Sequence, residues 1–292
     1  GRPVMCDQEQ LAKMGSVNRR QFGVLAGAGA VAACAPMAEG TVSADGLMEN
    51  TVTFAAPGGT FDGVFIHPAS GSHPAVILWP DIAGLRPAKV QMGRRLAAAG
   101  YAVLVANPYY RSVAGQQFED FDDWRNNDGW NKVTPWREAN TPAAVQETAR
   151  AVVAWLDAQD AVDSTRGIGN QGYCMTGSWT ILAAAAVPAR VKAAGSFHGG
   201  GLVGDGALAP VNLLGDMAAD AQALIAIAQD DDAENPDAKT ALRAAAENAA
   251  AEVDVEVYAG DHGWTVLDSP VYNEAEAERA WAELLEMYSE SL

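Results

Sequence analysis

The sequence predicts an α/β fold in which a mostly parallel central sheet is covered by helices on both faces. Short apolar runs such as Ala75–Trp79 and Tyr101–Ala106 are typical of strands that are buried on both sides. Segments with helical spacing, such as Arg86–Ala99, alternate with these runs along the chain. No internal repeat is visible, and a length of 292 residues suits one large domain. The alternation therefore indicates repeated strand–helix units rather than a bundle or a sandwich.

The remaining elements extend the same pattern. The chain opens with a predicted hairpin, whose strands flank a Pro-Gly-Gly turn at residues 57–59. Thr141 is the expected N-cap of a helix that runs to about Ala158. The hairpin strands are Thr51–Ala56 and Gly63–His67; later strands are Gly167–Gly172, Val191–Phe197, Ala223–Ala228 and Val253–Tyr258, with helices at Ser178–Ala186, Pro236–Ala251 and Glu274–Tyr288.

The segment between Tyr109 and Pro142 has no clear period. It is rich in Trp, Asp and Asn, and a loop of this length is usually a lid, a binding loop or a local subdomain. Trp124, Trp130 and Trp136 either cover the edge of the core or line a pocket, and the sequence does not decide between these roles.

The amino-acid composition limits which molecules the protein is expected to bind. The chain has 37 acidic residues against 19 Lys and Arg, a formal net charge of -18, which argues against nucleic acid as a partner. The three cysteines match neither a disulfide framework nor a zinc pattern. We expect no metal and no organic cofactor, and a monomer or a homodimer.

Residues 1–50 differ from the rest and are predicted to form an export signal and linker, followed by one domain over residues 51–292. Arg19 and Arg20 precede an apolar Gly/Ala-rich run, which is the layout of a twin-arginine (Tat) signal for export to the periplasm. The residues around Cys34 resemble a lipoprotein cleavage box, and only lipidation there would bring the protein to a membrane. Val42-Ser43-Ala44 offers a conventional cleavage site instead. If the signal is not used, the protein stays in the cytoplasm.

Cys174 is the candidate nucleophile. It lies in Gly172-Tyr173-Cys174-Met175-Thr176, between a predicted strand and a predicted helix, where a sharp turn exposes a nucleophilic side chain. The start of the helix also places N–H groups near the thiol, which lowers a thiol pKa and stabilises a developing oxyanion. A lone cysteine is more often a small buried hydrophobic residue, so this context carries the argument.

The base and the acid follow from chain order. His262 lies after the last predicted strand and before the last helix, and the order nucleophile, acid, histidine is that of a hydrolase triad. Asp230, Asp231 and Asp232 end the strand before, and spacing does not choose firmly among them; we take Asp231.

Together these segments resemble the dienelactone hydrolase family of the α/β-hydrolase superfamily, from about Thr51 to the C-terminus. The resemblance rests on six stretches whose order and spacing are specific: residues 79–85, 95–101, 107–111, 172–175, 196–200 and 261–264. It implies the α/β-hydrolase fold and a triad of Cys174, His262 and Asp231.

The resemblance also implies further site residues. The backbone N–H groups of Met175 and Ile82 would form the oxyanion hole, and Asp81, where the best-known members carry Glu, would tune the thiol. A second departure is Thr176, where the family usually has Gly. Candidates for substrate contacts are Arg111, Tyr110, His198 and Trp264, although His198 is also a candidate for a structural loop residue.

These features give one main functional hypothesis and two rivals. The main hypothesis is hydrolysis of a small-molecule ester or lactone through a thioester on Cys174. The first rival is an exported, non-catalytic protein that binds small molecules on a hydrolase scaffold. The second is redox work by Cys174, which would need a resolving cysteine nearby.

Overall fold

The structure is a computed structural model and describes residues 40–292. The predictions that concern Arg19, Arg20 and Cys34 lie outside the described residues. Among residues 40–292, no helix has the length and apolar character that crossing a bilayer requires.

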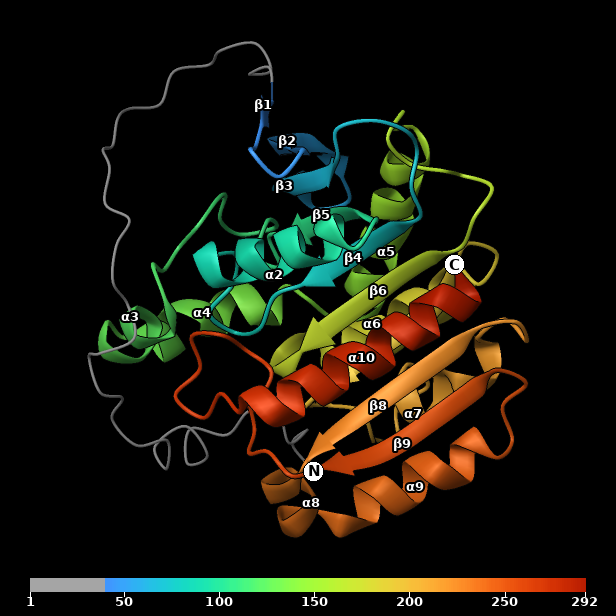
Figure 1. Ribbon diagram of the computed structural model, residues 1–292. Coiled ribbons are helices and arrows are strands. Elements are labelled where there is room, and N and C mark those ends of the chain that lie inside the picture. Colours follow the sequence, from blue (N-terminus) through green and yellow to red (C-terminus); the bar gives the residue numbers. More distant parts are fainter. Residues whose placement is uncertain (1–39) are drawn as a thin grey trace.

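One sheet of nine strands runs through the described part of the chain (Figure 1), in the order β1-β2-β3-β5-β4-β6-β7-β8-β9. The first three strands are antiparallel, and the six from β5 to β9 are parallel to one another. The predicted mostly parallel sheet is therefore confirmed. The strands are β1 (Thr41–Val42), β2 (Leu47–Ala56), β3 (Gly59–Pro68), β4 (Ala75–Trp79), β5 (Ala102–Ala106), β6 (Ile168–Tyr173), β7 (Val191–Phe197), β8 (Gln222–Ala228) and β9 (Glu252–Tyr258).

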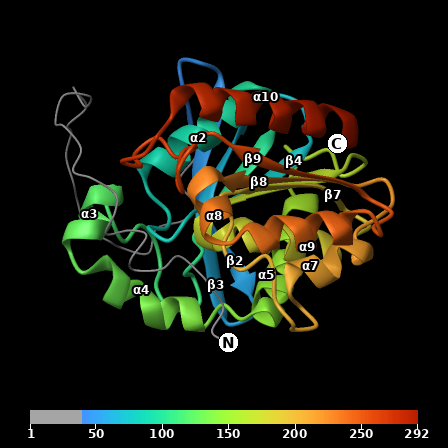
Figure 2. The same cartoon turned by 90° about the horizontal axis from the view of Figure 1, so that it is seen from below.

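Helices cover both faces of the sheet, as the sequence predicted. Figure 2 shows α2 and α10 on one face and α5, α7 and α9 on the other. Helix α6 packs on β6 and β7. The helices are α2 (Pro87–Ala98), α3 (Phe121–Asn126), α4 (Gly129–Glu138), α5 (Pro142–Asp157), α6 (Gly177–Ala186), α7 (Pro210–Leu213), α8 (Gln229–Glu234), α9 (Pro236–Ala246) and α10 (Glu274–Ser291), with short 3₁₀ turns at Cys174–Thr176 and Leu214–Asp216.

Alternating residues of the central strands pack into two separate hydrophobic cores, one on each face of the sheet. In β4, Ile77 and Trp79 belong to the core under α5 and α6, whereas Val76 and Leu78 belong to the core under α2 and α10. Successive side chains of a strand point to opposite faces, so a strand covered on both sides needs an unbroken apolar run. This is why the central strands could be predicted from short apolar segments.

The structure departs from the predicted elements at three places. The sheet begins at β1 and β2, so the predicted linker up to residue 50 is too long. The segment from residue 109 to 142, which we name the insert, contains the helices α3 and α4. The three aspartates that were predicted to end the strand lie in the short helix α8, which follows β8.

Candidate active site

Four neighbouring parallel strands end at one edge of the sheet, and a residue singled out from the sequence follows each of them (Figure 1). Cys174 follows β6, His198 follows β7, Asp231 lies in α8 directly after β8, and His262 follows β9. Two contacts tie these loops together. The N–H of Gly200 donates to the carbonyl oxygen of Cys174 at 2.9 Å, and the ring centroids of His198 and His262 lie 5.1 Å apart.

The turn that carries Cys174 is sharp and strained. Cys174 has φ 54°, in the left-handed region that non-glycine residues seldom adopt, and it begins the 3₁₀ turn between β6 and α6. A Cβ on Gly172 would lie 2.1 Å from the carbonyl oxygen of Thr176, so only glycine fits there. Thiolate chemistry at this position requires a reduced Cys174.

Thr176 closes this turn from inside. Its hydroxyl accepts a hydrogen bond from the N–H of Tyr173 at 2.9 Å and donates to the carbonyl oxygen of Trp79 at 2.8 Å. The side chain is fully buried and links the turn to the end of β4. Thr176 therefore fastens the turn and does not line an open pocket.

His262 and Asp231 form a direct pair. His262 Nδ1 lies 2.7 Å from Asp231 Oδ2. The neighbouring aspartates have other partners, because Asp230 accepts the backbone N–H of His262 at 2.9 Å and Asp232 pairs with Lys239 at 2.8 Å. Of the three carboxylates, Asp231 is the one that holds the imidazole.

The pKa values of His262 and His198 are shifted in opposite directions. Burial disfavours the charged form of His262, but the hydrogen bond and charge of Asp231, together with the charges of Asp230 and Asp81, outweigh it and raise the pKa of His262 above its usual value. His198 is buried beside His262 and Lys89, and burial first, then these charges, holds its pKa well below the usual range. These surroundings favour the neutral form of His198, whose Nε2 lies 3.0 Å from Thr265 Oγ1.

Tyr109 brings the two predicted oxyanion-hole segments together. Its hydroxyl donates to the carbonyl oxygen of Ile82 at 2.6 Å and lies 3.6 Å from the sulfur of Met175. Burial raises the pKa of Tyr109 well above its ordinary value, so the hydroxyl stays a donor. Tyr109 therefore contacts both Ile82 and Met175, the two residues whose N–H groups are predicted to form the oxyanion hole.

Comparison with known proteins decides the family. The model of the dienelactone hydrolase family matches residues 61–292. The chain is also 30% identical over 230 residues to a Salmonella typhi protein provisionally named a carboxymethylenebutenolidase, across 76% of this chain and 79% of that protein. The chain belongs to the dienelactone hydrolase family. It is thus a hydrolase, as the resemblance implied.

Solved structures agree on the fold. A Klebsiella pneumoniae protein, provisionally named a dienelactone hydrolase, is 26% identical, with a TM-score of 0.66 over 83% of this chain and 98% of its own. A dienelactone hydrolase-like promiscuous phosphotriesterase from metagenomic libraries is 20% identical, with a TM-score of 0.64 over 84% and 99%, and supports the fold alone. The predicted α/β-hydrolase fold is confirmed.

Asp81, which family resemblance singled out for thiol tuning, has charged partners of its own. Its carboxylate accepts two hydrogen bonds from Arg86, at 2.7 and 3.0 Å, and lies 2.9 Å from Lys89 Nζ. It also accepts the N–H of Ala83 at 3.0 Å, which shapes the loop that carries Ile82. Thiol tuning by Asp81 stays a prediction, and the contact with the Ala83 N–H shows that Asp81 holds the loop that carries Ile82.

A wider group of buried charges surrounds Asp81. Arg86 also binds Asp268 through two hydrogen bonds, at 2.7 and 2.8 Å, and Asp268 accepts the N–H of Phe121 in the insert at 3.0 Å. Lys89 Nζ lies 4.0 Å from the centroid of the Tyr173 ring. Asp81, Arg86, Lys89 and Asp268 have side chains at most 6% exposed, and we name them the ion cluster.

Burial and pairing set the charges of this cluster. Burial raises the pKa of Asp81, but Arg86 and Lys89 more than offset it and hold that pKa well below the usual range. Burial lowers the pKa of Lys89 to about 8, against the attraction of Asp81. The cluster contains two acidic and two basic side chains, so each charge has an opposite charge beside it.

Three of the predicted substrate-contact residues are engaged elsewhere. Tyr110 donates to the carbonyl oxygen of Pro57 at 2.7 Å, and Arg111 donates to that of Ala144 in α5 at 2.9 Å. Trp264 is fully buried in the core under α10. Their described contacts are structural, and His198 is the one member of that set that packs on the His262 ring.

Sequence reasoning missed Arg137 in α4. It follows Trp136, whose ring lies 5.4 Å from that of Tyr109, and its charge lowers the pKa of Tyr109 against the effect of burial. Among residues 40–292, no ion pair includes Arg137, and its buried Nε has no hydrogen-bond partner. Its place within a Trp-rich segment was the available signal.

Metal ligands do not converge in the described part of the chain. Residues 40–292 contain no group of three or more His, Cys, Asp and Glu side chains placed to hold a metal ion.

Proposed function

We propose that the protein hydrolyses a carboxylic ester or lactone through Cys174, His262 and Asp231. One observation carries the proposal: His262 Nδ1 lies 2.7 Å from Asp231 Oδ2, at the sheet edge where the strained turn presents Cys174. Asp231 holds the imidazole in one orientation and stabilises its protonated form, which favours the thiolate of a nearby cysteine.

The reaction proceeds in two halves. The Cys174 thiolate bonds to the carbonyl carbon, and the electron pair moves to the carbonyl oxygen, where the N–H groups of Met175 and Ile82 stabilise it. Collapse breaks the ester C–O bond, and the leaving alkoxide takes a proton from the His262 imidazolium. His262 then deprotonates a water molecule that attacks the thioester, which releases the acid and regenerates the thiolate.

Substitution of the nucleophile and the base tests the proposal. With reductant present, the wild type should hydrolyse p-nitrophenyl acetate and a small lactone, and Cys174→Ala and His262→Ala should each lose roughly 10³-fold or more in kcat. Iodoacetamide should alkylate Cys174 quickly near neutral pH in the wild type and slowly in His262→Ala. Undiminished turnover in Cys174→Ala would refute the assignment. An inert thiol and no turnover would instead favour a binding protein on a hydrolase scaffold.

We further propose that the substrate carries a negative charge that Arg137 receives. The chain has a net charge of -18, so an anionic substrate needs a local cation. Arg137 lacks a carboxylate partner among the described residues and interacts electrostatically with Tyr109, which contacts both oxyanion-hole segments. Arg137→Gln should raise KM for a carboxylated ester much more than for its neutral methyl ester. Arg111→Gln is the matched control, since Arg111 is bound to α5.

Export to the periplasm remains a proposal. It is supported by Arg19, Arg20 and the apolar run that follows them. Arg19→Lys with Arg20→Lys should leave the full-length protein in the cytoplasm of an expressing bacterium. Unchanged fractionation of that double variant would contradict Tat export, and loss of membrane association in Cys34→Ser would indicate lipidation.

A further inference from the structure

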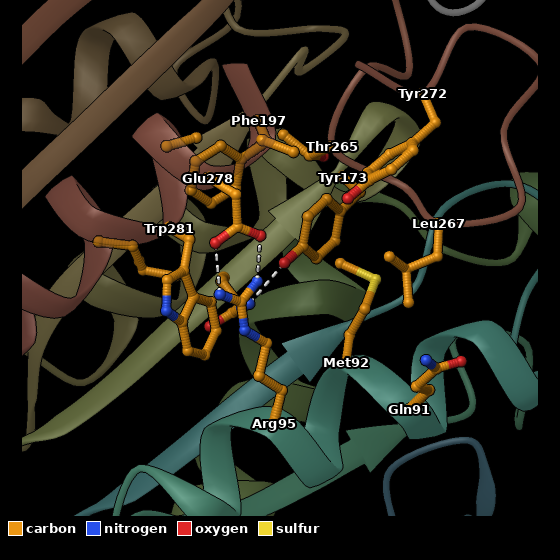
Figure 3. Close-up of a pocket in the computed structure, with 14 residues that line it drawn as sticks. Gln91, Met92, Arg95, Tyr173, Phe197, Thr265, Leu267, Tyr272, Glu278 and Trp281 are labelled. Atoms are coloured by element: carbon orange, nitrogen blue, oxygen red, sulfur yellow. Dashed lines mark hydrogen bonds and ion pairs between the residues drawn. The ribbon is translucent and has the colours of Figure 1, made fainter. Parts of the chain in front are cut away.

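A cavity of about 360 Å³ lies between α2 and α10, on the face of the sheet opposite α5 and α6 (Figure 3). This volume is within the range of small-molecule sites, which runs from roughly 300 to 1,000 Å³. The cavity is separate from the candidate active site. Tyr173 and Phe197 in its wall belong to the core under α2 and α10, whereas Cys174 and Met175 belong to the core on the other face.

The walls of the cavity are aromatic and aliphatic. Tyr173, Phe197, Tyr272 and Trp281 contribute rings from four different segments (Figure 3). Methionine and aliphatic side chains fill the spaces between them: Met92, Leu267, Ala277, Ala280 and Leu284. Flat apolar walls of this kind favour a ring-containing ligand, because stacking adds to the burial of apolar surface.

The charges in the wall cancel each other. Arg95 donates two hydrogen bonds to Glu278, at 2.7 and 2.6 Å, and its guanidinium lies 4.1 Å from the centroid of the Trp281 ring. Figure 3 shows this pair beside Trp281. Because each charge is already paired, the cavity offers no free counter-ion to a charged ligand. An uncharged ligand suits it better.

The floor of the cavity offers one hydrogen-bond donor. The Tyr173 hydroxyl accepts a hydrogen bond from the side-chain amide of Gln171, whose carbonyl oxygen accepts from the Tyr288 hydroxyl at 3.1 Å. In this chain of hydrogen bonds the Tyr173 oxygen is an acceptor, so its own proton is available to another group. Burial raises the pKa of Tyr173 well above its ordinary value, which keeps that proton in place.

We propose that this cavity is a second ligand site, for an uncharged aromatic molecule that carries one hydrogen-bond acceptor, and that such a ligand acts as an effector of the hydrolase. The aromatic walls take the ring, and the Tyr173 hydroxyl donates to the acceptor. Tyr173 directly precedes Cys174, so the ligand binds beneath the nucleophile's turn. Thr265, also in the wall, lies 3.0 Å from Nε2 of His198, whose ring packs on His262.

Acetophenone is a suitable probe, because it is uncharged and aromatic and has one carbonyl acceptor. Binding is followed by the indole N–H resonance of Trp281 in ¹⁵N-labelled protein, assigned through Trp281→Phe. We expect saturable movement of this resonance in the wild type. Ala277→Phe, which fills the cavity from α10, should weaken binding at least about tenfold. Ala275→Phe, on the exposed side of the same helix, should leave binding unchanged.

Three results would overturn the site. These are no saturable shift up to the solubility limit of acetophenone, equal binding by Ala277→Phe and the wild type, and loss of binding in Ala275→Phe. Leu267→Trp fills the same cavity from the loop after β9 and replaces Ala277→Phe if that variant does not fold.

The donor role of Tyr173 has its own test. Tyr173→Phe should weaken acetophenone binding by about three- to tenfold, the usual effect of one lost hydrogen bond. Binding of isopropylbenzene, which has a similar shape and no acceptor, should change little in the same variant. Equal losses for both probes would show that the hydroxyl does not donate to the ligand.

The effector role rests on the proposed function, whereas binding at Trp281 does not. At an acetophenone concentration that fully shifts the Trp281 resonance, kcat for p-nitrophenyl acetate should change. KM should not rise in proportion to the acetophenone concentration, as it would with a competitive inhibitor. The change should disappear in Ala277→Phe. If the enzyme hydrolyses p-nitrophenyl acetate and acetophenone leaves its kcat unchanged, the effector role is overturned. If the enzyme shows no esterase activity at all, the result counts against the proposed function instead.

Discussion

Three adjacent aspartates at the start of α8 have three different partners. Asp230 accepts the backbone N–H of His262, Asp231 binds the imidazole, and Asp232 pairs with Lys239. Successive side chains of a helix point about 100° apart, so identical neighbours face different surroundings. Sequence spacing could place an acid here, but the choice of Asp231 depends on how α8 is turned against β9.

We predict that Asp231→Asn lowers kcat for ester hydrolysis by about 10²–10⁴-fold, because the His262 imidazole loses the carboxylate that orients it. Asp232→Asn is the matched control and should retain nearly wild-type kcat. Initial rates with p-nitrophenyl acetate measure both. The reverse order of effects would place the triad acid at Asp232.

The insert is the element whose structure could be predicted least. Its helix α3 has only six residues, too few to show a hydrophobic period, and α4 contains Pro135. Contacts with distant residues hold it: the N–H of Phe121 donates to Asp268, and the Trp136 ring packs on Tyr109. By contrast, α5 was predictable with its Thr141 cap, since local sequence alone specifies that start.

Removing the Asp268 carboxylate should loosen the insert. Asp268→Ala deletes the acceptor of the Phe121 N–H and one partner of Arg86, so the local opening free energy of α3 should fall by about 1–3 kcal/mol. Hydrogen exchange of the α3 amides, followed by mass spectrometry, measures this change. Asp160→Ala, an exposed control, should leave the exchange of α3 unaltered, and equal protection in Asp268→Ala would show that other contacts hold the helix.

On the scale of the whole molecule, the ion cluster joins parts of the chain that are far apart in sequence. Arg86 and Asp268 are separated by 182 positions, and no local pattern could have predicted that they meet. The mostly parallel sheet and both helical layers could be predicted, because each strand and helix carries its own apolar periodicity. The contacts that hold the loops around the site could not, because they depend on the assembled fold.

Removing the central cation of this cluster should destabilise the whole domain. Arg86→Met leaves two buried carboxylates with Lys89 alone, and loss of one partner from a buried ion pair costs about 3–5 kcal/mol. Arg94→Met breaks the exposed pair with Glu49 and should cost less than about 1 kcal/mol. Urea unfolding followed by fluorescence measures both. Similar losses in the two variants would show that the cluster contributes no more than a surface pair.

The raised pKa of His262 gives stability a pH dependence. The stabilisation is fully present below the unfolded pKa of about 6.5 and is lost as pH rises through the higher folded value. Asp231→Asn removes the largest of the interactions that raise this pKa. The Tm difference between wild type and Asp231→Asn should therefore be greater at about pH 6 than at about pH 9, and a difference that grows with pH would contradict the assignment.

The thioester intermediate tests the account most directly. Reduced protein is mixed with p-nitrophenyl acetate, quenched in acid within the first turnovers and digested, and the peptide that contains Cys174 is weighed by mass spectrometry. We predict that this peptide gains one acetyl group and that the adduct persists longer in His262→Ala, because deacylation lacks its base. Continued turnover with an unmodified Cys174 peptide would contradict the account.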